Sequence, residues 1–92
     1  MIAKKKGRLE VIHYILSLVM KGNNSVLITP LMRASRLSSA RFSEYLAELI
    51  DKGFIREVTD KKAKRYLSLT DKGFAFLEKY RMIQGFIDEF EL

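Results

Sequence analysis

The segment TPLMRASRLSSARFSEYLAELIDKGFI, residues 29–55 of this 92-residue chain, contains the signals of two helices joined by a short link. Thr29 stands where a helix N-cap is expected, and Pro30 stands at the first helical position, where its missing N–H costs nothing. A short helix is therefore expected to follow. A second helix is predicted from about Ser39 to Lys52, because its apolar residues fall within an arc of about 140°: Phe42, Tyr45, Leu46, Leu49 and Ile50. Two helices joined by the short link 35–38 describe a helix-turn-helix.

The flanking segments extend this pattern on both sides. Residues 8–21 have apolar side chains at intervals of three and four, which predicts a largely buried helix, and residues 25–28 suit a brief β-strand. After the helix-turn-helix, the β-rich segments 54–59 and 65–69 are separated by a polar loop of hairpin length. Helix, short strand, helix, helix, strand, basic loop and strand is the winged-helix order. The predicted fold class is α+β, mostly helical.

The tetrapeptide DKGF occurs twice, at residues 51–54 and 71–74. The first copy is expected to end a helix, with Gly53 in the left-handed conformation that turns the chain into the next strand. The second copy is expected to begin a helix, with Thr70 as its N-cap and Gly73 present for close packing rather than for a turn. The two copies therefore bracket the predicted hairpin.

The charge of the chain favours a polyanionic partner. Seventeen Lys and Arg residues against eleven Asp and Glu give a formal charge of +6 and a pI of about 9.7, which is typical of nucleic-acid-binding domains. The bases gather in two clusters, one within residues 1–10 and one within residues 60–66, whereas the last ten residues hold three acids and no base. The alternative interpretation is that these basic runs are ordinary solvated faces.

Two segments resemble archaeal winged helix-turn-helix regulators, namely residues 29–55 quoted above and YLSLTDKGFAFLEKY, residues 66–80. They are most similar to the small dimeric chromatin-type DNA-binding proteins of Sulfolobus known as the ten-kilodalton "a" class. The shared features are a Lys-rich start, a short second helix after Thr, and a Leu in the turn that is followed by Ser. Two sequence motifs are shared as well: KG[FL]I after the third helix and LT-x-KG at the start of the final helix. The last two also recur in many other winged-helix families. The resemblance implies double-stranded DNA binding by a homodimer held by its C-terminal helices.

DNA contact is expected from the start of the second helix of the helix-turn-helix, since in this mode that helix enters the major groove by its N-terminal end. Its outward face carries three acids, Glu44, Glu48 and Asp51, so we expect weak base readout and strong phosphate contact. The alternative role of the serines is capping alone. The predicted DNA-binding residues are Lys4, Lys5, Lys6, Arg33, Arg36, Ser38, Ser39, Ala40, Arg41, Ser43, Lys61, Lys62, Lys64 and Arg65.

A final helix is expected from Asp71 to Leu92, longer than a winged-helix core needs, with Phe74 and Leu77 facing that core. A further apolar stripe has heptad spacing: Phe76, Tyr80, Ile83, Ile87 and Phe90. Because an exposed aromatic stripe is rare on a monomer, we expect it to form a dimer interface. Bases precede Ile83 and acids follow it, which favours an antiparallel coiled coil centred there. Alternatively, the helix folds back and buries the stripe in its own subunit.

The expected organisation is a DNA-binding domain with a basic arm at residues 1–70 and a dimerisation helix at residues 71–92. No enzyme, cofactor, metal site or small-molecule substrate is expected, because the chain has no Cys, no Gly-rich phosphate loop and a single His, His13. No segment is apolar enough to span a membrane, so we expect a cytoplasmic, nucleoid-associated protein, either a transcription regulator or an architectural chromatin protein. The second hypothesis is a winged-helix protein–protein interaction module, favoured by the acidic outward face.

Overall fold

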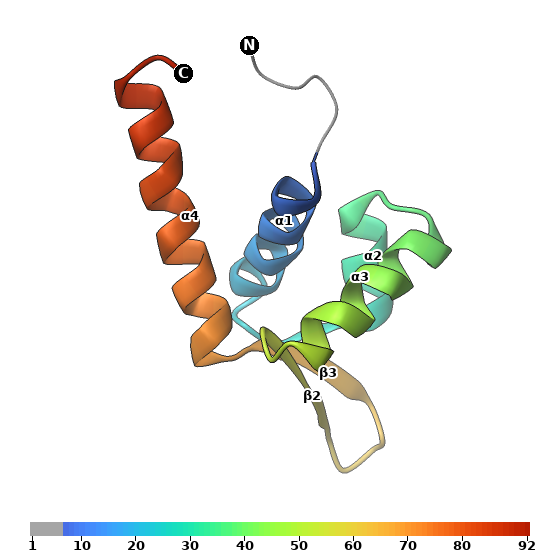
Figure 1. Cartoon of the computed structure of the whole chain (residues 1–92). Coiled ribbons are helices and arrows are strands. Elements are labelled where there is room, and N and C mark those ends of the chain that lie inside the picture. The colour runs from blue at the N-terminus through green and yellow to red at the C-terminus, as the bar shows by residue number, and fades with distance from the viewer. Residues whose placement is uncertain (1–6) are drawn as a thin grey trace.

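A computed structural model describes residues 7–92 of the chain, and within them the predicted winged-helix order is confirmed (Figure 1). The elements are α1 (Arg8–Lys21), β1 (Val26–Leu27), α2 (Ile28–Ser35), α3 (Ser39–Asp51), β2 (Ile55–Thr59), β3 (Arg65–Leu69) and α4 (Asp71–Glu89). The β2–β3 hairpin projects from one end of the molecule, and the C-terminal end of α4 projects from the other. We call this hairpin with its loop, residues 55–69, the wing.

The sheet has the order β1-β3-β2, and both pairings are antiparallel. Ile55 lies opposite Leu69 on β2 and β3, and Val26 of β1 lies opposite Leu67. Since successive side chains of a strand point to opposite faces, Leu67 and Leu69 share the face that packs on the helices. Both are buried, as their alternation in the sequence predicted.

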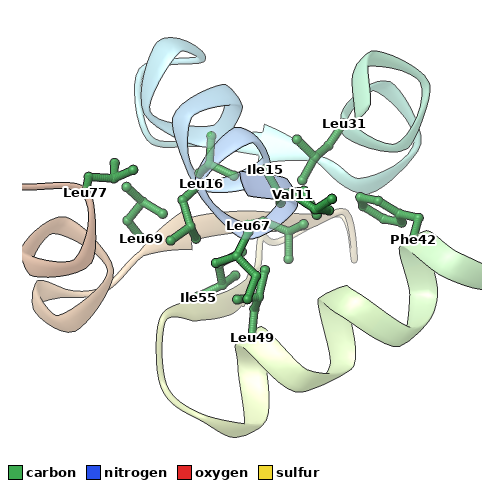
Figure 2. Packing of buried hydrophobic residues seen from close by; sticks show 12 residues of the cluster. Val11, Ile15, Leu16, Leu31, Phe42, Leu49, Ile55, Leu67, Leu69 and Leu77 are labelled. Carbon is green, nitrogen blue, oxygen red and sulfur yellow. The ribbon is translucent and has the colours of Figure 1, made fainter. Parts of the chain in front are cut away.

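The core is built around α1, whose apolar stripe is buried from Val11 to Val19, whereas Leu9 at its start is exposed. Ile15, Leu16 and Val19 have no exposed surface, which confirms the predicted burial of this helix. Figure 2 shows side chains from every layer meeting there, with Leu31 and Phe42 on one side and Leu69 and Leu77 on the other. The helix-turn-helix and the sheet therefore both pack on α1.

The predicted start of α2 is wrong by two residues. The helix begins at Ile28, and its N-cap is Leu27, which has an extended backbone and no side-chain cap. The reason is that Leu27 still pairs with Tyr66 in the sheet, so the chain passes directly from strand to helix without a separate capping residue. Pro30 is tolerated as the third helical residue, because the first four N–H groups of a helix have no partner within it.

The two DKGF copies have the predicted opposite roles, and they also contact each other. Gly53 has a φ of 82° after α3, and the Thr70 hydroxyl oxygen accepts a hydrogen bond from the Gly73 N–H (3.1 Å). The backbone N–H of Thr70 donates to the Phe54 carbonyl (3.1 Å), its hydroxyl donates to the Gly53 carbonyl, and Lys72 Nζ donates to the Lys52 carbonyl (2.7 Å). These bonds join the end of α3 to the start of α4. We call this contact the DKGF joint.

The first turns of α4 belong to the core, whereas its second half leaves it. Gly73 and Leu77 are buried against the rest of the domain, and residues 81–86 are all exposed. Phe74 does not face the core as expected but is 41% exposed, because Gly73 and Leu77 take the inward positions. The helix ends at Glu89 rather than at Leu92, with Phe90 as its C-cap.

Gly73 is predicted to be required by the DKGF joint. A Cβ atom at this position would collide with the Phe54 carbonyl oxygen, whereas Gly85 in the same helix has open space around it. Gly73→Ala should therefore lower the free energy of unfolding by about 1–3 kcal/mol through overpacking. The matched control Gly85→Ala should raise it by up to about 1 kcal/mol, because Ala is the better helix former. Urea denaturation checks both values, and a Gly73→Ala protein as stable as the parent would contradict the packing role.

Candidate nucleic-acid interface

A buried serine fixes the turn between α2 and α3. Ser35 Oγ donates to the Met32 carbonyl (2.6 Å) and accepts from the Leu37 N–H (3.2 Å). Arg36 then takes the left-handed conformation with a φ of 61°, which reverses the chain toward α3 and leaves its side chain exposed. Sequence reasoning missed the role of Ser35. Its only signal was a small polar residue in the last position of a helix.

The first turn of α3 is held by Ser38 and presents small polar side chains outward. Ser38 Oγ accepts a hydrogen bond from the Arg41 N–H (3.2 Å), so the capping role is real. A serine hydroxyl is also a donor, and its proton remains available to a phosphate oxygen when the oxygen accepts from the backbone. Ser39, Ala40 and Ser43 are exposed beside it.

The acidic face of α3 is less negative than its sequence suggests. The Glu48 carboxylate contacts the Arg8 guanidinium and also lies 2.8 Å from Lys52 Nζ, so its charge is neutralised within the chain. Glu44 and Asp51 are exposed. The remaining acids lie away from the first turn, which is where the helix-turn-helix mode brings α3 nearest to bases.

The loop of the wing is organised by a single carboxylate. Asp60 Oδ1 accepts hydrogen bonds from the backbone N–H groups of Lys62 (2.8 Å) and Lys64 (2.9 Å), and Ala63 is held at a φ of 64°. Between residues 7 and 92, no carboxylate lies within ion-pair distance of the ammonium groups of Lys61, Lys62 or Lys64. The backbone of the loop is therefore fixed while its cationic side chains stay available to solvent.

Arg65 differs from the other bases of the wing. Its Nε lies 2.9 Å from Glu57 Oε2 across the hairpin, so part of its charge is already neutralised. Both residues remain well exposed, and exposed pairs of this kind contribute little to stability. Of the four predicted DNA-binding bases of the wing loop, Arg65 is therefore the one whose charge is already partly neutralised.

The structure brings the wing and the helix-turn-helix together. They face each other across an open groove with a volume of about 640 Å³. Thr29 and Pro30 at the start of α2 line one side of this groove, and Lys64 and Arg65 of the wing line the other. The α2–α3 turn presents Arg36 and Ser38, and Arg33 is exposed on α2. Lys4, Lys5 and Lys6 lie outside the described residues. The other predicted DNA-binding residues are exposed on the helix-turn-helix or the wing.

The predicted dimer residues of α4 fall into two groups. Phe76 lies against Phe54 (ring centroids 5.5 Å apart) and Tyr80 stacks on His13 (4.1 Å), so these two rings pack within their own chain. Ile83 and Phe90 are 58% and 57% exposed, and Ile87 is half-buried. The first half of the stripe follows the fold-back alternative, and the second half projects beyond α1 (Figure 1).

His13 is a structural residue of the α1–α4 contact. Burial beneath the Tyr80 ring lowers the pKa of its imidazole, and burial followed by the charge of Glu10 raises the pKa of the Tyr80 hydroxyl. Within residues 7–92, no group of three or more His, Cys, Asp or Glu side chains is arranged to hold a metal ion. None of the helices in that range has the length and hydropathy needed to cross a bilayer.

The chain belongs to the winged helix-turn-helix family, whose model matches residues 5–87. Comparison with curated protein sequences finds no match. Among solved structures, Sso10a-2, a DNA-binding protein from Sulfolobus solfataricus, is similar with a TM-score of 0.69 and 18% identity over 94% of this chain and 90% of that one. This match confirms a resemblance in fold to that Sulfolobus protein.

A regulator has a similar fold but is longer. MepR, a transcription regulator of the Staphylococcus aureus multidrug efflux pump MepA, aligns with a TM-score of 0.72 and 20% identity over 88% of this chain. The aligned part is 58% of the MepR chain. At this identity the two comparisons establish a common fold.

Asp60 is predicted to be required for an ordered wing loop. Asp60→Ala removes the acceptor of two backbone N–H groups, so amide hydrogen exchange at Lys62 and Lys64 should become several-fold faster, as NMR can measure. Asp60→Asn keeps a side-chain oxygen acceptor and is the matched control, with slower exchange than the Ala variant. Equal exchange rates in the Ala variant and the parent would show that the carboxylate does not order the loop.

Proposed function

We propose that this protein is a homodimeric double-stranded DNA-binding protein that holds DNA mainly by its phosphates. The observation that carries the proposal is the wing, where Asp60 fixes the loop backbone and leaves Lys61, Lys62 and Lys64 unpaired beside the helix-turn-helix. Unpaired cations on an ordered loop suit contact with a polyanion, because binding releases condensed counterions from the DNA. The DNA-binding function of Sso10a-2, which shares the fold, supports the same conclusion.

Sequence specificity is expected to be low to moderate. The N-terminal end of α3, which is expected to read bases, presents Ser39, Ala40 and Ser43. The Arg41 guanidinium lies over the Tyr45 ring, with its Cζ atom 5.9 Å from the ring centroid. Small hydroxyl side chains accept many base edges, whereas strong discrimination usually comes from bidentate Arg, Asn or Gln contacts. Phosphate contacts fix the position of the protein on the duplex but carry no sequence information.

The dimer is proposed to form through the projecting half of α4. This half lies at the end of the molecule opposite the wing, so pairing there leaves both wings free for DNA (Figure 1). A dimer with two separated DNA-binding ends acts either as a regulator on a two-fold site or as an architectural protein that bridges duplex segments. Either role places the protein in the cytoplasm, associated with the nucleoid.

A protein–protein interaction module is the second candidate. The specific observation in its favour is that Glu44 and Asp51 remain exposed on the outward face of α3, where they oppose contact with phosphates. Absence of duplex binding at low salt would support this candidate over the first.

The wing lysines are predicted to contribute affinity without selectivity. Lys61→Ala/Lys62→Ala/Lys64→Ala should weaken binding to all duplex sequences alike and reduce the slope of log affinity against log salt by up to about 3, since each lost phosphate contact removes about 1. The control Lys21→Ala removes a base from an exposed position on α1, away from the wing and from the proposed dimer face of α4, and should bind nearly as the parent does. Fluorescence anisotropy measures both. Equal affinities of the two variants would exclude the wing role.

Ile83 is predicted to lie in the dimer interface. Ile83→Asp places a charge in the exposed apolar part of α4 and should convert the dimer to a monomer in light scattering, because burying an unpaired carboxylate is costly. Gln84→Asp adds the same charge to the next residue, on the side of α4 that faces Ser17 and Met20 of α1, and should leave the mass unchanged. A parent protein with the mass of a monomer would contradict the proposed dimer.

A further inference from the structure

We propose that a groove between α1, α3 and α4 receives the C-terminal end of α4 from a second copy of the chain, with the partner's Phe90 as the anchoring side chain. This inference rests on the proposed homodimer and specifies where the end of each α4 binds. It adds α1 and α3 to an interface otherwise made by α4 alone.

The groove has the size and lining to accept an aromatic ring. Its volume is about 280 Å³, and its apolar lining comes mainly from Leu9 and Ile12 of α1, Leu49 of α3, and Phe54 and Phe76. A cavity of about 150 Å³ lined by apolar side chains is large enough to bind benzene. Leu9, at the rim, is 60% exposed although it is a large apolar residue at the start of a helix.

The projecting half of α4 has an apolar face that nothing in residues 7–92 covers. Met82, Ile83, Phe86 and Phe90 are 68%, 58%, 54% and 57% exposed, and the rings of Phe86 and Phe90 lie 4.9 Å apart. At 100° per residue these four positions span an arc of about 100°, turned away from the inward-facing Leu77. The exposed face therefore runs along one flank of the helix and ends in a pair of aromatic rings.

The groove and this face are complementary in position. Ile83 lies seven residues after Phe76 and seven before Phe90, so the three residues are spaced by two heptads along α4 and its C-cap. In an antiparallel pair of α4 helices centred on Ile83, a two-fold axis places the partner's Phe90 beside Phe76. Phe76 is a wall of the groove, so the partner's ring would lie at the groove.

The charges around the groove match the end that it would receive. Arg8 and Lys52 stand at the rim, and the single acid there, Glu48, leaves the rim with one net positive charge. The last residues of the chain carry Asp88, Glu89 and Glu91 and no base. Attraction between opposite charges thus favours binding of this end of α4 in the groove over binding of the basic first half of the helix. No feature of the described residues favours a protein partner of unrelated sequence in the same way.

The proposed contact has a consequence for the DNA-binding half of the molecule. Glu48 and Leu49 belong to α3, so the partner's α4 would touch the C-terminal end of the helix whose N-terminal end approaches DNA. The orientation of the two helix-turn-helix units would then be fixed by direct contact between α3 of one subunit and α4 of the other. Without this contact the two units would be connected only through the paired α4 helices.

Cross-linking between single-cysteine chains tests the inference, because the natural chain contains no Cys. Leu9→Cys chains are mixed with Phe90→Cys chains and treated with a short bismaleimide, and a cross-linked heterodimer is expected. The matched control replaces Leu9→Cys by Met20→Cys, which is also exposed on α1 but borders the opposite side of α4, and should give only background cross-linking. Glu89→Cys, which leaves Phe90 in place, serves as a second reporter if Phe90→Cys weakens the dimer.

The outcomes separate this inference from the dimer itself. A parent protein that is monomeric in light scattering overturns both the dimer and the groove. A dimeric protein in which neither reporter cross-links to Leu9→Cys, or in which Met20→Cys reacts equally well, overturns the groove alone. Selective cross-linking to Leu9→Cys supports the proposed contact.

Discussion

The contact between the two DKGF copies holds α3, the wing and α4 in one arrangement. Three successive carbonyls, those of Lys52, Gly53 and Phe54, accept hydrogen bonds from the segment that starts α4. Gly73 packs directly on the Phe54 carbonyl, where no Cβ fits. The end of α3, the base of the wing and the start of α4 thus meet in one place. The orientations of these three elements relative to one another are set there by backbone contacts, and these contacts leave no room for a side chain at position 73.

This joint gives the molecule two ends with different chemistry. On one side lie the wing, whose loop backbone is held by Asp60 while its lysines remain unpaired, and the first turn of α3. On the other side lies the projecting half of α4, with exposed Ile83, Phe86 and Phe90 and a run of acids. A cationic end suits a polyanion, and an apolar end suits another copy of the same surface. The core around α1 connects the two.

Much of the fold could be predicted from the sequence, because helical periodicity, Gly53 and Thr70 act locally. The start of α2 could not, since Leu27 is held by pairing with Tyr66, a residue far along the chain. For the same reason the neutralisation of Glu48 by Arg8 was invisible, as was the packing of Phe76 on Phe54. The heptad spacing of α4 predicted an apolar stripe, of which Ile83 and Phe90 are exposed. It could not show which half of that stripe α1 and Phe54 already cover, because that depends on where the DKGF joint directs the helix.

The affinity of the unmodified protein for several unrelated DNA duplexes, measured over a range of salt concentrations, shows whether it holds DNA mainly by the phosphates. If unpaired wing lysines and the helix-turn-helix bind mainly phosphates, log affinity falls linearly and steeply with log salt, with nearly the same slope for every duplex. An affinity that hardly changes with salt, or no duplex binding even at low salt, would contradict the account.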